Sequence, residues 1–234
     1  MHLVFHIFRK EFKSYFVSPI AYIVISIFLL VNGWFFFSTF FIYGQDTLRT
    51  FFNLLPIVFS FFVPAVTMRL FSEELNIGSY EILLTMPVTP NMIIIGKFLA
   101  GVAFIASMLV PTLAYAITAS FLGQLDWGPI IGGYVGAILL GASFSAIGLF
   151  ASSLTRNQII AFIIGMAICF GLTMINNLSF LIPRSILEVL IYIGAGYHFQ
   201  NISKGIIDSR DIIYFLSLCF LGLYGAHLSI QQKR

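Results

Sequence analysis

Three carboxylate side chains stand within one short polar segment, residues 69–97, between two long apolar runs. They are Glu73, Glu74 and Glu81, three of the nine acidic residues in a chain of 234. A chain so poor in charge has little reason to gather carboxylates here unless a partner outside the bilayer binds them. We therefore predict a docking loop over residues 72–89. Its candidate contact residues are Glu73, Glu74, Gly78, Ser79, Tyr80, Glu81, Leu83 and Leu84.

The loop is predicted to contain a short helix, residues 80–86. Ser79 is a suitable N-cap, and Glu81 lies near the positive end of the helix dipole. Pro87 cannot continue the helix and ends it. A short charged helix of this kind makes a rigid docking element.

No pattern for catalysis accompanies these carboxylates. The only Gly-Lys pair, Gly96-Lys97, is followed by Phe98, so the chain has no G-x-x-x-x-G-K-S/T phosphate-binding loop. His198 has no second His or Cys at metal-ligand spacing, and we predict a surface or interface residue. The sequence therefore predicts a chain that is not an enzyme, binds no cofactor or metal itself, and takes energy from a partner.

The elements that must position this loop are membrane-spanning helices. The chain is 59% hydrophobic and 9% charged, whereas a soluble domain carries roughly 25% charged residues. A spanning helix needs about 20 apolar residues, and a charged residue at its centre costs about 2.5–3.5 kcal/mol. Six stretches meet this requirement, so we predict an all-α membrane protein. The predicted spans are 19–43, 51–71, 90–121, 129–153, 157–181 and 211–230. They lack a central ionisable residue, which disfavours a proton- or sodium-driven transporter.

The placement of Lys and Arg predicts that both termini face the cytoplasm. Eight basic residues fall on the side of the termini and four on the other, as the positive-inside bias requires. The inner set is Arg9, Lys10, Lys13, Arg69, Lys97, Arg156, Lys233 and Arg234, and the outer set is Arg49, Arg184, Lys204 and Arg210. The net charge of +3 is then an orientation signal, and no nucleic-acid partner is predicted.

Two shorter segments flank the spans. Residues 1–17 place Phe8 and Phe12 on one helical face and Arg9 and Lys10 on the other, which predicts an amphipathic helix in the headgroup plane. It either transmits force as an elbow or simply anchors the chain. Residues 185–204 contain a charge-free run, interrupted by glycine, that reaches only about 22 Å, short of a hydrocarbon core of about 30 Å. We predict two short helices that enter the membrane part-way and return.

The fourth span is rich in small residues at helical spacing. Gly132 and Gly136 form one small-xxx-small pair, and Ala142 and Ala146 form another. This spacing allows helix backbones to approach closely. We favour packing within the chain over a dimer seam.

The chain resembles the permease subunits of ABC-2 type transporters over nearly its whole length. Family members show an acidic residue, a Gly-Thr/Ser-x-Glu-x-Leu run, a Pro, and a Gly-Lys that opens the third span. Those places are filled here by Glu74, Gly78-Ser79, Glu81, Leu83, Pro87 and Gly96-Lys97, with Ser79 where Thr is more usual. The N-terminal FRKEFKSYFVSP and the outer insertion match as well. Within the family, the chain is most similar to the short permeases of gliding-motility and nitrous-oxide-reductase accessory systems.

The resemblance implies a six-helix half-transporter of the ABC-2 (type V exporter) fold in the bacterial inner membrane. Two permeases, identical or different, would pair around a central path, each docked to a cytoplasmic ATPase that binds ATP and Mg²⁺. The short helix after Ser79 would be the coupling helix, and residues 1–17 the elbow. The segment 185–204 would form re-entrant outer helices. Its expected gate residues are Gly194, Gly196, Tyr197 and His198.

Three functions remain open from the sequence. The first is ATP-powered export of a lipid-like, glycan or hydrophobic molecule. The second is mechanotransmission, in which the chain changes the shape of an extracytoplasmic protein without moving cargo. The third is a static scaffold for a membrane complex, which the capped docking loop disfavours.

Overall fold

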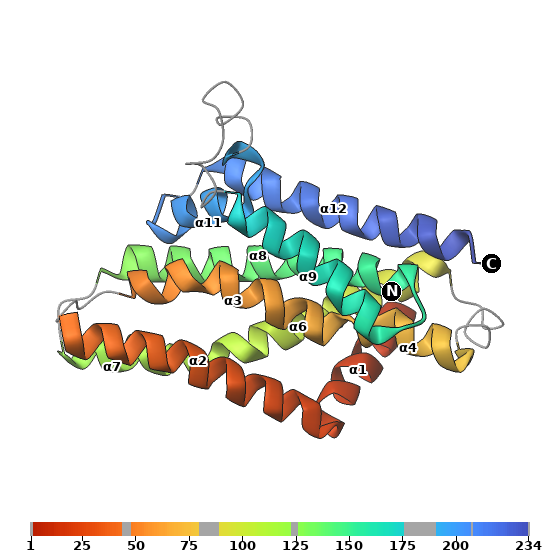
Figure 1. Ribbon diagram of the computed structural model, residues 1–234, viewed down its shortest axis with the longest axis horizontal. Helices are drawn as coiled ribbons and strands as arrows, with labels where there is room; N and C mark the ends of the chain where they lie inside the picture. The colour runs from red at the N-terminus through yellow and green to blue at the C-terminus, as the bar shows by residue number, and fades with distance from the viewer. Residues whose placement is uncertain are drawn as a thin grey trace.

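The structure is a computed structural model, and it describes residues 2–43, 48–79, 89–122, 126–175, 191–206 and 208–233. These residues form helices and contain no strand. Figure 1 shows the long helices side by side. The helices are α1 (His2–Val17), α2 (Pro19–Tyr43), α3 (Arg49–Thr67), α4 (Arg69–Ile77), α6 (Pro90–Leu109), α7 (Leu113–Leu122), α8 (Trp127–Leu154), α9 (Gln158–Met174), α11 (Ala195–Ser203) and α12 (Ser209–Gln231); the 3₁₀ turn η1 (Val110–Thr112) joins α6 to α7.

The prediction of an all-helical, multi-pass membrane protein is confirmed. Five helical segments of the described chain are long and apolar enough to cross a membrane. They are Pro19–Ser38, Arg49–Ile77, Pro90–Phe121, Trp127–Leu154 and Ser209–Gln231. The predicted fifth span, 157–181, is represented by the shorter apolar helix α9, which is about 26 Å long at 1.5 Å per residue. A sixth crossing therefore stays a prediction.

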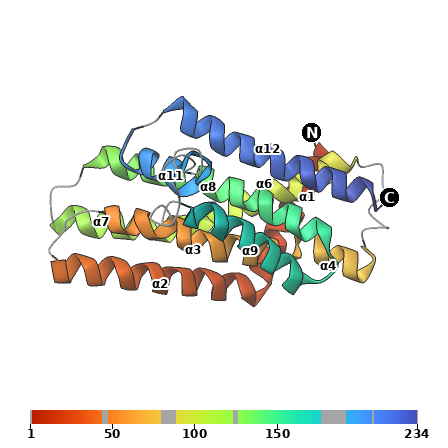
Figure 2. The same cartoon turned by 45° about the horizontal axis from the view of Figure 1, so that its top comes forward.

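Helix α8 is the centre of the bundle and packs against α3, α6, α9, α11 and α12 (Figure 2). Its small residues allow these close approaches. A Cβ added at Gly132 would lie 2.4 Å from the carbonyl oxygen of Ile202 on α11, and one at Gly136 would lie 3.1 Å from the Ile202 side chain. A Cβ at Gly222 of α12 would lie 2.7 Å from the main chain of Ala146. The predicted packing of small residues within the chain is confirmed at these positions.

The second span is broken at Met68, where α3 ends and α4 begins. The first turn of a helix has main-chain N–H groups without intrahelical partners, and Ser152 of α8 supplies an acceptor for two of them. Its Oγ accepts hydrogen bonds from the N–H groups of Phe71, at 2.9 Å, and Ser72, at 3.0 Å. The same hydroxyl donates to the carbonyl of Met68 at 2.6 Å. The interruption is thus stabilised from a neighbouring helix.

The break changes where the acidic residues lie. Helix α4 continues to Ile77, so residues 72–77, predicted as loop, are helical, and Glu73 and Glu74 lie on a helix. The helix ends at Gly78, whose φ of 76° is left-handed and suits glycine. The predicted short helix, residues 80–86, lies outside the described residues.

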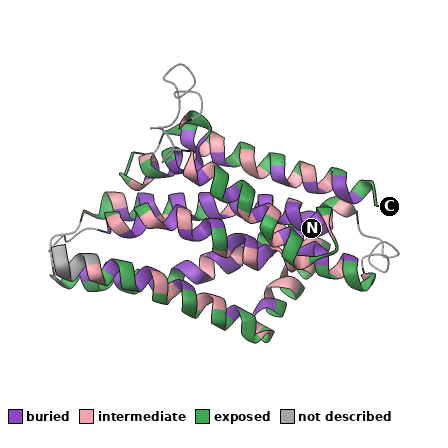
Figure 3. Ribbon diagram, viewed as in Figure 1, coloured by how far each residue is buried: buried purple, intermediate pink, exposed green. Residues whose placement is uncertain are grey.

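The two ends of the bundle carry different elements. Helix α1 lies across the direction of the long helices at one end, together with α4 and the C-terminal end of α12, while α11 lies at the other end (Figure 1). The outward faces of α2 and α12 are largely exposed (Figure 3). Only 22% of the span window of each is buried, against 72% in α8. These apolar faces therefore contact lipid or another membrane subunit.

Candidate functional site

A buried lysine joins three helices at the α1 end of the bundle. Lys97, in the second turn of α6, is 1% exposed. Its Nζ donates to Glu11 Oε1 of α1 at 3.0 Å, to Glu74 Oε1 of α4 at 2.8 Å, and to the Leu70 carbonyl at 2.7 Å. These contacts use all three ammonium hydrogens. The ring of Phe71 adds a cation–π contact at 5.3 Å. We call this set the Lys97 junction.

The Lys97 junction has one excess negative charge, because two carboxylates face one ammonium group. The Glu11 and Glu74 side chains are 14% and 15% exposed, so water reaches part of each. Glu74 Oε2 is buried and has no hydrogen-bond partner within the described residues. The negative charge of the junction therefore meets solvent only through the exposed fraction of the two glutamate side chains.

The glycine of the Gly96-Lys97 pair allows α1 to pack closely on α6. A Cβ at Gly96 would lie 2.7 Å from Cγ2 of Ile7, so only glycine allows this approach. Glu11 follows Ile7 by one helical turn on α1, which places its carboxylate beside Lys97. One further turn brings the ring of Tyr15 to 4.8 Å from the ring of Phe104. The same α1 face thus combines steric, ionic and aromatic contacts with α6.

The elbow residues predicted from the sequence lie beside this contact face. Phe8 and Phe12 are half-buried and their rings stack at 5.8 Å, while Arg9 and Lys10 are exposed. Glu11, an acidic residue between Phe8 and Phe12, was not among the site residues predicted from the sequence. Its recognisable signal was the spacing of Ile7, Glu11 and Tyr15, which repeats every four residues.

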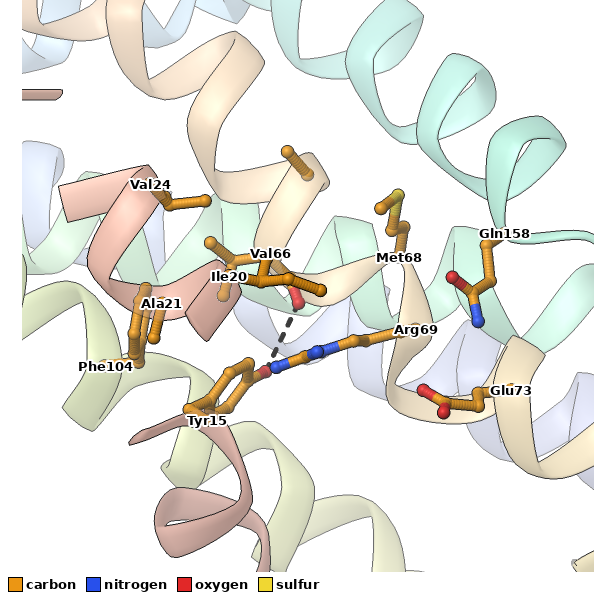
Figure 4. Close-up of a pocket in the computed structure, with 11 residues that line it drawn as sticks. Tyr15, Ile20, Ala21, Val24, Val66, Met68, Arg69, Glu73, Phe104 and Gln158 are labelled. Carbon is orange, nitrogen blue, oxygen red and sulfur yellow. Dashed lines mark hydrogen bonds between the residues drawn. The ribbon is translucent and has the colours of Figure 1, made fainter. Parts of the chain in front are cut away.

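Tyr15 also connects α1 to the α3–α4 break (Figure 4). Its hydroxyl donates to the carbonyl of Val66 at 3.4 Å, and the Arg69 guanidinium lies 5.0 Å from the ring centroid. Burial raises the pKa of Tyr15 above its usual value, against the opposing effect of Arg69, so the phenol stays protonated. Glu73 and Gln158 line the same hollow, which has a volume of about 140 Å³.

A larger groove of about 550 Å³ runs between α1 and α4 and is partly open. Its polar lining carries both signs of charge. The charged and hydroxyl residues that line it are Lys10, Glu11, Ser14, Ser18, Arg69, Glu73, Glu74, Ser79 and Lys97. The structure thus brings together Lys10, Glu73, Glu74 and Ser79 from the predicted site. Tyr80, Glu81, Leu83 and Leu84 lie outside the described residues.

The predicted outer residues form a different arrangement. His198 was predicted to be a surface or interface residue; it is not at the surface but lies at the contact between α11 and α12. His198 is 0% exposed, and Nδ1 lies 2.6 Å from Oδ1 of Asp211. Gly194 precedes α11, Gly196 is buried within it, and Tyr197 is 39% exposed. This pair could not be recognised in the sequence, because its partners are 13 positions apart and meet only where α11 packs on α12. The first part of the predicted outer pair, 185–190, lies outside the described residues.

Residues 5–191 match the family model described as ABC-2 family transporter protein. The chain belongs to the ABC-2 transporter family. As an ABC-2 permease it is a membrane subunit of an ABC transporter; the family's ATPase is carried by a separate protein, and its permeases form a membrane-embedded dimer. No curated protein gives a match to this permease. The matched residues include the whole Lys97 junction and end before His198 and Asp211.

Proposed function

We propose that this permease subunit couples ATP hydrolysis by a separate ATPase to export of a substrate across the bacterial inner membrane, with both termini in the cytoplasm. ATP and Mg²⁺ bind the partner ATPase, which docks on residues 73–84, and a second permease completes the path. The observation that carries this proposal is the buried Lys97 junction. It lies where the loop leaves α4 and returns to α6.

The junction gives force a route from the loop into the bundle. The loop begins after α4 and ends at α6, and Lys97 of α6 binds both Glu74 and the Leu70 carbonyl of α4. A push on the loop therefore moves the ends of both helices together. Glu11 carries α1 with them, while Ser152 connects the start of α4 to the central helix α8. Connected, buried contacts of this kind transmit displacement with little slack.

The charge of the α1–α4 groove supports docking of a basic side chain. Glu73 is exposed on the groove, next to the partly exposed Glu74 of the Lys97 junction. An arginine of the ATPase would bind the Glu73 carboxylate through a charge-assisted hydrogen bond and offset the negative charge of the junction. Lys10 and Arg69 on the same groove would restrict the position of that arginine.

Docking is tested by charge reversal in the loop. Glu81→Arg is the informative variant because Glu81 belongs to the predicted docking loop and is not one of the residues that form the Lys97 junction. We expect Glu81→Arg to abolish co-purification of the ATPase while membrane insertion is unchanged. The matched control is Glu188→Arg, on the predicted outer side, which keeps the ATPase. Retention of the ATPase by Glu81→Arg would exclude docking at this position.

The second candidate function is mechanotransmission to an extracytoplasmic protein. It is favoured by the close packing of α11 on α12 at the predicted outer end, because two helices held together in this way would move as one unit against a partner. Reconstitution into lipid vesicles separates the two functions. Export predicts cargo accumulation that depends on ATP. Sustained ATP turnover with no accumulation of any candidate cargo, after correction for leak, supports mechanotransmission instead.

A further inference from the structure

Arg69, at the break between α3 and α4, is a cation without a carboxylate partner in the described part of the chain. It is half-buried, and its contact with the ring of Tyr15 is a cation–π interaction. A guanidinium group has five N–H donors, and none of them has an oxygen acceptor among the described residues. Arg69 can therefore bind a ligand that presents oxygen atoms.

The hollow beside Arg69 has a polar side and an apolar side (Figure 4). Glu73 and Gln158 form the polar side together with Arg69, and residues such as Ile20 and Val24 form the apolar side. Neither the Glu73 nor the Gln158 side chain is hydrogen-bonded to another described residue. The volume of about 140 Å³ holds a group of the size of a phosphate, and it is too small for an acyl chain.

The hollow lies where three apolar helices reach the edge of the membrane. Helix α2 begins at Pro19, α9 begins at Gln158, and α3 ends at Thr67. Helix α1, which lies across the direction of the long helices, reaches the hollow at Tyr15. Lipid headgroups occupy this level, at which apolar spans give way to charged residues.

An exposed apolar stripe leads away from the hollow along α2. Ile20 lines the hollow, and Ile23, Ile27 and Leu30 continue the stripe; all four are exposed. Residues at this spacing lie on one face of a helix. A ligand with its polar group in the hollow would lay a hydrocarbon chain along this face, which is the form of a phospholipid.

We propose that the hollow binds the headgroup of phosphatidylethanolamine, with Arg69 and Gln158 donating to the phosphate and Glu73 accepting from the ammonium group. Residues four apart on a helix have Cβ atoms about 5–6 Å apart, a spacing that suits the two ends of this zwitterion. A headgroup without an ammonium group would bring its phosphate near Glu73 with no compensating charge. The site therefore favours a zwitterionic lipid over an anionic one.

The lipid site does not depend on ATPase docking, although both proposals use Glu73. A carboxylate has about four lone-pair sites, so Glu73 can accept from a lipid ammonium group and from an arginine of the ATPase together. The hollow is lined by residues of the permease. The lipid site is therefore tested on the purified permease, and its failure would leave ATPase docking untouched.

Native mass spectrometry measures lipid binding directly. The whole chain in detergent micelles is titrated with dioleoylphosphatidylethanolamine, and bound lipid is counted per permease. We expect Arg69→Gln to bind this lipid about tenfold more weakly, because hydrogen bonds to charged groups are among the strongest. The matched control is Arg49→Gln, at the opposite end of the second span. It loses the same charge and should bind the lipid as the wild type does.

Glu73→Gln tests the selectivity for the headgroup. Dioleoylphosphatidylglycerol has the same phosphate and chains but no ammonium group. We expect the wild type to bind the ethanolamine lipid more tightly than the glycerol lipid, and Glu73→Gln to lose this preference. Glycerophosphoethanolamine, the headgroup without chains, should not displace the bound lipid at equal concentration. This competition separates a lipid site from a site for a soluble phosphate compound.

Two outcomes would overturn the lipid site. One is Arg69→Gln binding the ethanolamine lipid as tightly as the wild type, which would mean that Arg69 serves only the contacts within the chain. The other is equal binding of the two lipids by the wild type, as nonspecific contact with the apolar surface would give. If Arg69→Gln does not fold, Gln158→Leu replaces it in the same measurement, with weaker binding expected and unchanged binding against the site.

Discussion

Each end of this permease buries a basic side chain between helices, but the two residues differ: one is a lysine and the other is a histidine. The Lys97 junction pairs a lysine with two carboxylates and borders an open groove. The His198–Asp211 pair joins a histidine to one carboxylate and is sealed. The α1 end thus has an ion-pair network that borders solvent, whereas the pair at the α11 end is enclosed by protein.

The largest effect is expected at the Lys97 junction. Lys97→Met leaves Glu11 and Glu74 facing each other without a cation, and breaking a buried pair in this way costs about 3–5 kcal/mol. Equilibrium unfolding in mixed micelles measures the loss. Lys10→Met, at an exposed groove position, is the control and should change stability little.

The charges of the Lys97 junction also predict how the stability lost in Lys97→Met can be recovered. The triple variant Lys97→Met, Glu11→Gln, Glu74→Gln removes all the charges of the Lys97 junction and should recover much of the lost stability, since an uncharged replacement of a buried pair is often tolerated. A triple variant as unstable as Lys97→Met would show that packing around the lysine stem, and not charge, holds α1, α4 and α6 together.

A smaller loss is expected at the His198–Asp211 pair. His198→Ala leaves one buried carboxyl group without its partner, whereas Lys97→Met leaves two, so the cost is about 1–3 kcal/mol, that of an unsatisfied polar group. The same unfolding assay compares it with His6→Ala, an exposed histidine on α1. A loss at His198 equal to or above that of Lys97→Met would contradict the distinction between the two ends.

Glycine contacts at the two ends differ in what an added methyl group would meet. A Cβ at Gly132 meets the main-chain carbonyl of Ile202, whereas one at Gly96 meets the side chain of Ile7, which can be shortened. Overpacking typically costs about 1–3 kcal/mol. We expect Gly132→Ala to destabilise more than Gly96→Ala, and Ile7→Ala to rescue only Gly96→Ala. Thermal unfolding of Gly132→Ala and Gly96→Ala, each alone and combined with Ile7→Ala, tests this order, and equal losses without rescue would oppose it.

The sequence was sufficient for the features that depend on composition and local spacing. Freedom from charge located the long apolar helices, and the small residues around Gly132 indicated close packing. The contacts of Lys97 and His198 were harder to predict from the sequence. Lys97 was assigned to the edge of a polar segment because its partners, Glu11 and Glu74, lie 86 and 23 positions away. His198 was assigned only to the surface or an interface for the same reason, since its pairing with Asp211 depends on how α11 packs against α12.

The smallest effect is expected where the two ends are connected through α8. Ser152→Ala removes the acceptor for two N–H groups of α4, and loss of an N-cap costs typically about 1 kcal/mol. Ser153→Ala is the matched control because that hydroxyl, also fully buried, donates only to Phe150 of its own helix. Since Ser152 connects α4 to α8, Ser152→Ala should also lower transport more than its stability loss explains, with ATPase co-purification retained. Measured in vesicles beside Ser153→Ala, equal transport in both would show that movement of α4 reaches the outer end by another route, through α6.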